Sequence, residues 1–110
     1  MEFEAYQLSI INQSWGDDID EFFIQAHCEV RQKGVPGGEA FGINIVSPKF
    51  FVKELGSNES VHEYGRGYLF ATDYDENSIL SELQKLIDGS HAKTWDELLA
   101  YIEKYFSWIA

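Results

Sequence analysis

The segment Glu39–Gly56 constrains the fold most, because it changes from a strand pattern to a helix pattern with no loop between them. Its first half is predicted to be a half-buried strand by three apolar residues at every second position, Phe41, Ile43 and Ile45. Ser47 then predicts a helix N-cap, and Pro48 suits the first helical position, which needs no amide proton. Gly56 predicts the helix end, where positive φ is common. A strand and a short helix must therefore pack in a fixed relation.

The segment Phe22–Lys33 shows the clearest alternation. Its two faces differ completely: Phe22, Ile24, Ala26, Cys28 and Val30 on one, and Gln25, His27, Glu29, Arg31 and Lys33 on the other. One face of the sheet is thus expected to face the core and the other to face solvent, which favours antiparallel pairing. The next segment, Gly34–Gly38, has hairpin turn chemistry. A phosphate-binding loop is a poor alternative, because such a loop opens a helix and carries Lys followed by Ser or Thr.

Two more strands are predicted, one before these segments in the sequence and one after them. Phe3–Ile11 is the first, with three apolar residues on one face, Tyr6, Leu8 and Ile10. Tyr64–Thr72 is the fourth, and its Gly65 and Gly67 indicate a bulge or a close backbone approach rather than a ligand site.

Two amphipathic helices follow the fourth strand. Asp73 and Glu76 have the spacing of a capping box for a helix that ends at Gly89. Thr94 and Glu97 cap a second helix, whose apolar stripe continues to the C-terminus. The predicted fold is α+β: a four-stranded, mainly antiparallel sheet in the order β-β-β-α-β-α-α, covered by helices on one face, with residues 1–110 as a single domain.

Charge is the strongest functional signal in the composition. Nineteen acidic and eight basic residues give a formal net charge of −11. Nucleic acid is an unsuitable partner, because phosphate binding relies on Lys and Arg. A basic protein is the natural partner, with solubility alone as the alternative. Since the chain has no leader at Met1 and no long apolar run, we expect a cytoplasmic protein without a membrane partner.

Residues with catalytic or metal-binding chemistry do not cluster in the sequence. His27, His62 and His91 are isolated, and Cys28 lies on an apolar strand face, so neither a metal site nor a cofactor is predicted. A Ser, His and Asp could still assemble in three dimensions, but no nucleophile-elbow sequence supports this arrangement. We therefore expect a protein that is not an enzyme.

Acidic residues beside aromatic ones are the candidate partner-binding sites. They form three groups: Trp15 with Asp17, Asp18, Asp20 and Glu21; Glu59, Glu63 and Tyr64; and Tyr74 with Asp75. Aromatic side chains supply binding hot spots, and carboxylates pair with Lys and Arg. Trp15 could instead tuck under the sheet while the loop acids are merely solvated. Because Asp73 and Glu76 are assigned to the helix cap, only Asp75 remains free beside Tyr74.

Three motifs in order resemble bacterial immunity protein 8, a family of polymorphic-toxin immunity proteins. They are F-x-I-N-I-V running into S-P-K-F-F from Phe41, GRGYLFATDYD at Gly65–Asp75, and T-W-D-E-L-x(6)-Y-F-x-W at Thr94–Trp108. The resemblance implies a protein that protects its own cell by binding and masking a cognate toxin. The acid excess predicts that this toxin is basic, as a nuclease would be. The alternative is an acidic interaction module or nucleic-acid mimic without a toxin partner.

Overall fold

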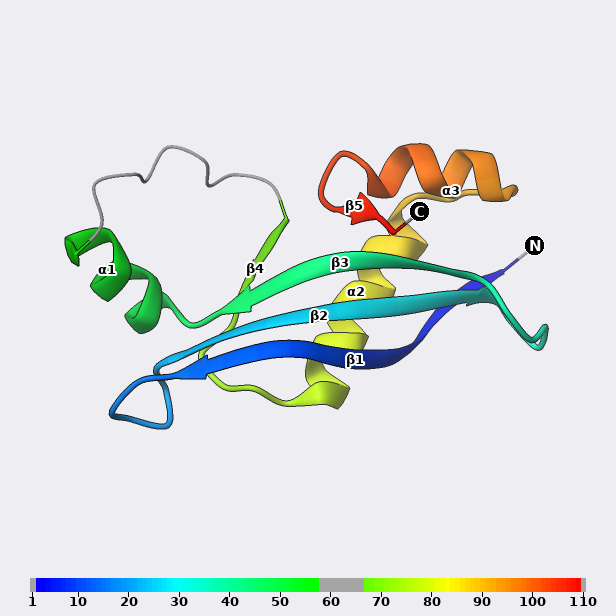
Figure 1. Ribbon diagram of the computed structural model, residues 1–110. Helices are drawn as coiled ribbons and strands as arrows, with labels where there is room; N and C mark the ends of the chain where they lie inside the picture. Colours follow the sequence, from blue (N-terminus) through cyan, green and yellow to red (C-terminus); the bar gives the residue numbers. More distant parts are fainter. Residues whose placement is uncertain (1, 58–66, 110) are drawn as a thin grey trace.

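The computed structural model of the chain describes residues 2–57 and 67–109. Its elements, in order, are β1 (Phe3–Trp15), β2 (Phe22–Gln32), β3 (Glu39–Val46), α1 (Pro48–Ser57), β4 (Tyr68–Phe70), α2 (Glu76–Gly89), α3 (Trp95–Ile102) and β5 (Ser107–Trp108). The sheet order is β1-β2-β3-β4. The first three strands are antiparallel neighbours, β4 runs parallel to β3, and β5 pairs antiparallel with β3 (Figure 1). The predicted α+β class with a mainly antiparallel sheet is confirmed.

One face of the sheet forms the core, and α2 crosses it (Figure 1). The alternation predicted for β2 is confirmed, because every apolar residue of its inner face is buried: Phe22, Ile24, Ala26, Cys28 and Val30. α2 and α3 cover these side chains with Ile79, Leu83, Ile87, Leu98 and Ile102. These two helices therefore hold the sheet from one side, as predicted.

α1 packs against the opposite face of the sheet, at one end. Phe23 points away from the core, and its ring centroid lies 6.1 Å from that of Phe50 in α1. Ser47 fixes the start of the helix as predicted: its Oγ accepts from the Phe50 amide and from the Phe22 amide, both at 3.1 Å. α1 continues through Gly56, predicted as its end, to Ser57. This junction places the polar side of α1 beside the loop between β1 and β2.

β1 is longer and less regular than predicted. It continues beyond Ile11 to Trp15, and its register with β2 shifts between Ala5 and Gln7 and again between Ile10 and Asn12. Such bulges insert an unpaired residue and change which side chains share a face. The prediction that Tyr6 shares a face with Leu8 and Ile10 is therefore wrong. The Tyr6 ring lies on the outer face, where the Arg31 guanidinium sits 4.4 Å from its centroid.

The C-terminal segment forms a strand, although a continued helix was predicted. α3 ends at Ile102, and Phe106 turns inward to stack on Phe41 with ring centroids 5.1 Å apart. Trp108 then pairs with Phe41 in β5, and its Nε1 donates to the Leu99 carbonyl at 2.8 Å. The Leu99 carbonyl therefore accepts from the Trp108 indole as well as from the Glu103 amide, which ties the C-terminal strand to the last turn of α3.

The fourth strand is shorter than predicted within the described residues. β4 covers only Tyr68–Phe70, and Gly65 lies outside the described residues. Gly67 has a φ of +89°, and its carbonyl accepts from the Asn44 amide at 2.8 Å, which agrees with the predicted close backbone approach.

Candidate partner-binding surface

The loop between β1 and β2 is folded tightly at the end of the sheet. The Gly16 amide donates to the Glu21 carbonyl at 2.8 Å, and the Glu21 amide donates to the Asp18 carbonyl at 3.0 Å. Glycine is required at position 16 because a Cβ atom there would collide with the Glu21 side chain. Glu21 is consequently only 5% exposed and points inward. It is not displayed to a partner, in contrast to the sequence prediction.

Lys49 of α1 neutralises part of this loop. Its Nζ lies 2.8 Å from Asp18, 3.3 Å from Asp20 and 3.7 Å from Glu21. The hydrogen bond from Lys49 lowers the pKa of Asp18 below its usual range. The carboxylates of Asp18 and Asp20 in turn raise the pKa of Lys49. These two acids are therefore engaged within the molecule.

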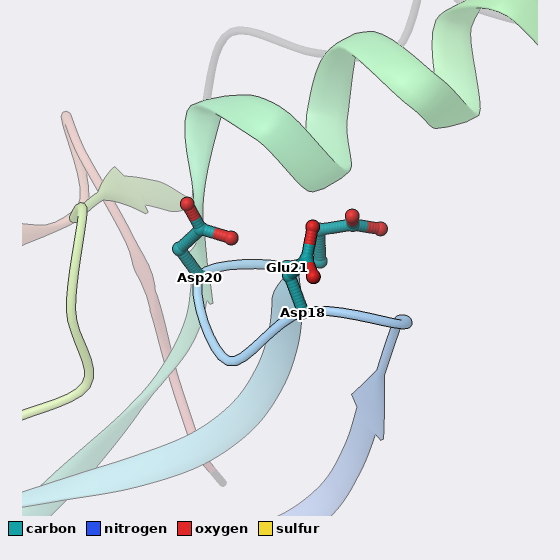
Figure 2. A group of neighbouring side chains, drawn as sticks. All are labelled: Asp18, Asp20 and Glu21. Carbon is teal, nitrogen blue, oxygen red and sulfur yellow. The ribbon is translucent and has the colours of Figure 1, made fainter.

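The same three carboxylates are grouped closely enough to suggest a metal site. Ligand oxygens of Asp18, Asp20 and Glu21 lie within 4.8 Å of one another, and their side chains converge beneath α1 (Figure 2). The Lys49 ammonium, however, stands at ion-pair distance from all three. This cluster thus has an internal cation that satisfies its charge, and it resembles a structural ion-pair network more than an open metal site.

Lys53 of α1 forms the second half of this network. Its Nζ lies 3.0 Å from Glu21 and 3.7 Å from Asp17, whose side chain is 94% exposed. Glu21 is the first cause of the raised pKa of Lys53. The loop retains two more carboxylates than the two lysines neutralise, and Asp17 is the most accessible of them. Sequence reasoning missed both lysines because they come after β3, although their i, i+4 spacing on one helix face was a usable signal.

Trp15 and Tyr74, from two of the predicted groups, are brought together by Phe22. The ring centroid of Phe22 lies 5.3 Å from Trp15 and 6.4 Å from Tyr74. Trp15 is 46% exposed, and its Nε1 donates to the Gln13 side chain at 3.0 Å. The indole ring of Trp15 therefore packs on Phe22 at the end of the core with one side and is exposed to solvent on the other. Burial, with a contribution from Glu76, raises the pKa of Tyr74.

The acids beside Tyr74 have roles opposite to those predicted. Asp75 is the N-cap of α2, because its carboxylate accepts from the Asn77 amide at 3.3 Å and from the Ser78 hydroxyl at 2.8 Å. Asp73 is exposed and makes no hydrogen bond or ion pair with any described residue. Among these acids Asp73, rather than Asp75, is thus free to meet a partner. The assignment of Asp73 and Glu76 as a capping box is wrong.

A shallow groove lies beside Asp73, between β4 and α2. It has a volume of about 430 Å³ and apolar residues on its floor, including Leu69, Ala71 and Ile79. Among the described residues, its polar lining includes Asp73, Asp75 and Glu82 and no basic residue. Glu82 pairs with Lys85 at 3.0 Å and Asp75 caps α2, so this groove joins apolar surface to the unpaired carboxylate of Asp73.

Three of the predicted site residues, Glu59, Glu63 and Tyr64, lie outside the described residues. Cys28 is fully buried, and burial raises the pKa of its thiol to about 12, which makes it a poor nucleophile at neutral pH. None of the helices in the described ranges is long and apolar enough to cross a membrane.

Comparisons with known proteins identify a family. No curated protein and no solved structure was found to match the chain. The family model described as immunity protein 8 matches residues 2–109. This match extends the resemblance carried by the three motifs to nearly the whole sheet and both core helices. The chain belongs to the immunity protein 8 family.

Proposed function

We propose that this protein neutralises a cognate basic toxin, such as a nuclease, by binding it one to one and masking its active cleft. Family membership supports neutralisation of a toxin. The observation that carries the finer proposal is the acid-lined groove beside the Trp15–Phe22–Tyr74 row, because it combines apolar contact area with the unpaired carboxylate of Asp73. A nuclease must present positive charge to its own phosphate substrate, so it fits such a surface. Inhibition of this kind needs no catalytic group and no cofactor.

The contact residues divide by their availability. The strongest candidates are two aromatic residues, Trp15 and Tyr74, and two acids, Asp17 and Asp73. Neither acid is buried in the loop network. Asp18, Asp20 and Asp75 are engaged in internal bonds and contribute chiefly through their field. Glu59, Glu63 and Tyr64 stay candidates from the sequence alone. Glu21 is withdrawn as a direct contact because it is buried.

Steering by the net charge supports the proposed mechanism. A formal charge of −11 on one small domain creates a long-range field for a basic partner. Complementary fields of this kind raise association rates towards about 10⁸–10⁹ M⁻¹s⁻¹ at low salt. An interface of about 1,600 Å² in total would then hold the complex.

The test is co-purification with the polypeptide encoded immediately upstream of this chain's gene, followed by association kinetics at low and high salt. We expect a one-to-one complex, protection of cells that express the toxin, and an association rate that falls as salt rises. A complex with salt-independent association would remove the steering mechanism but keep neutralisation. If nothing binds and cells are not protected, the acidic interaction-module alternative takes the place of this proposal.

A further inference from the structure

Within the described residues, the outer edge of β1 is a long backbone surface that pairs with no other strand of the sheet. β1 is the terminal strand of the order β1-β2-β3-β4, and it lies at the open border in Figure 1. Only its beginning is covered. The Gln84 side chain of α2 accepts from the Ala5 amide at 2.8 Å and donates to the Phe3 carbonyl at 3.0 Å, as a neighbouring strand would do.

Beyond Ala5 no hydrogen bond from another described element covers this edge, and the edge itself carries no charge. Within the described residues, the only side chain that bonds its backbone further along is that of Asn12, which accepts from the adjacent Gln13 amide at 2.9 Å. The segment Gln7–Trp15 contains no charged residue, in a chain with 19 acidic and eight basic ones. Its apolar side chains are exposed: Ile10 by 44% and Ile11 by 59%.

Edge strands of soluble proteins normally avoid this combination. They are shortened, covered, or marked with Lys or Pro, because an open apolar edge recruits another strand. Here the first part of β1 is protected by Gln84, whereas the longer second part has only the bulge near Ile11. An edge that is left open in one half of a strand and closed in the other indicates a strand-binding site.

A second copy of this chain is a poor occupant of the edge. Each copy carries a formal charge of −11, and the loop at the end of β1 keeps an excess of carboxylates over the lysines that contact it. Two copies would therefore repel each other as they approach along β1. A basic partner would be attracted by the same field and could lay an uncharged extended segment along the uncharged edge.

We propose that residues Gln7–Trp15 of β1 bind an extended segment of the toxin by strand addition. This inference rests on the proposed function and names how the toxin is held. Backbone hydrogen bonds supply part of the affinity in this mode, and side chains beside the edge supply the specificity. Ile10, Ile11 and Trp15 are the apolar side chains available on it. The acidic loop then lies at the end of the added strand, where Asp17 can meet a basic residue.

The first readout needs no variant. Hydrogen exchange of the wild-type protein is measured with and without the upstream-encoded toxin polypeptide. Outward-facing amides between Gln7 and Trp15 exchange freely while the edge is open, and they should be slowed at least about tenfold once a strand is added. Amides of α3 serve as the internal reference, because this helix contacts β5, which pairs with β3 rather than with β1.

The second readout compares three substitutions. Ile11→Lys places a charge on the edge and should weaken the complex by at least about tenfold. Val52→Lys is the matched control, since Val52 is 66% exposed on α1 and the charge change is the same. Gln25→Lys is a control for docking on the outer sheet face, because Gln25 lines a hollow there together with Ile11. Sedimentation of each free protein gives its oligomeric state.

The outcomes separate the two proposals. Slowed exchange along β1 together with a specific effect of Ile11→Lys supports strand addition. If the complex forms and protects cells but β1 exchange is unchanged and Ile11→Lys behaves as Val52→Lys does, strand addition is overturned and neutralisation stands. A free dimer that Ile11→Lys dissociates would assign the edge to a second copy and also overturn the inference. Absence of any complex with the toxin removes both.

Discussion

Asp17 and Glu21 belong to the same short loop and carry the same charge, but the structure gives them different roles. Asp17 is almost fully exposed, whereas Glu21 is buried beneath α1 with Lys53 at 3.0 Å. Asp17→Lys should therefore slow association with the toxin several-fold and change the free energy of unfolding by less than about 0.5 kcal/mol. Association is measured by stopped flow and stability by urea unfolding.

Glu21→Lys is the matched substitution, with the opposite expected result. It removes a carboxylate that Lys49 and Lys53 both contact and places a third ammonium beside theirs, so we expect a loss of about 1–3 kcal/mol of stability. Equal effects of the two substitutions on stability would show that the ion pairs beneath α1 contribute little to folding. Equal effects on association would show that the loop acts through its total charge rather than through Asp17.

The pair of Asp18 and Lys49 predicts a dependence of stability on pH. The pKa of Asp18 is lowered from its usual value of 3.8, first by the hydrogen bond from Lys49. A lowered pKa in the folded state contributes stability above the unfolded pKa, and this contribution is lost as pH falls through the folded pKa. Asp18→Asn should thus be less stable than wild type at neutral pH, and the difference should begin to shrink near the usual value of 3.8 and vanish only below the lowered pKa of folded Asp18.

The control for this pH series is Glu39→Gln. Glu39 is exposed at the start of β3 and has no ion-pair partner among the described residues, so its stability difference from wild type should show no comparable acid dependence. Urea unfolding across the pH range measures the stability of Asp18→Asn and of Glu39→Gln relative to wild type. A difference for Asp18→Asn that persists unchanged at low pH would contradict the pairing with Lys49.

At the scale of elements, the start of α2 separates a capping acid from a free one. Asp75→Ala removes the N-cap and should cost about 1 kcal/mol of stability, because two bonds to the first turn are lost. Asp73→Ala should leave the free energy of unfolding within about 0.5 kcal/mol and instead weaken binding of the toxin. Thermal unfolding and titration calorimetry measure the two effects. If Asp73→Ala destabilises and Asp75→Ala does not, the N-cap has been assigned to the wrong residue.

Elements whose residues interact with near neighbours in sequence were predictable. The alternation in β2, the Ser47 cap of α1 and the Thr94 cap of α3 depend on local spacing, and each appears as expected. The capping acid of α2 was misplaced because Asp73 and Asp75 both have a partner at suitable spacing, and backbone geometry chooses between them.

Features that depend on distant contacts were not predictable from local pattern. β5 exists because Trp108 pairs with Phe41 and bonds the Leu99 carbonyl, which a helical stripe cannot reveal. The bulges of β1 move Tyr6 to the outer face for a similar reason, since register depends on β2. The candidate site shows the same limit: its acids and aromatic residues were visible, but the lysines that neutralise part of it come from α1.

At the scale of the molecule, the charge of −11 opposes folding and assists binding at once. The molecule measures 45 × 26 × 23 Å. At about 0.01 M salt the Debye length is about 30 Å and most charges interact, whereas at about 0.15 M it is about 8 Å and only neighbours do. Added NaCl over this range should therefore raise the free energy of unfolding of the free protein while it slows association with the toxin.

The sign of the salt effect on the free energy of unfolding distinguishes net repulsion across the whole molecule from local ion pairs. If net repulsion dominates, a double variant with Glu39→Gln and Glu103→Gln, which removes two exposed charges, should respond less to salt in urea unfolding. If the ion pairs of Lys49 and Lys53 dominate instead, salt would screen them and stability would fall. Because those pairs hold α1 to the loop, a fall would also mean that the acidic loop is ordered by its lysines before any toxin arrives.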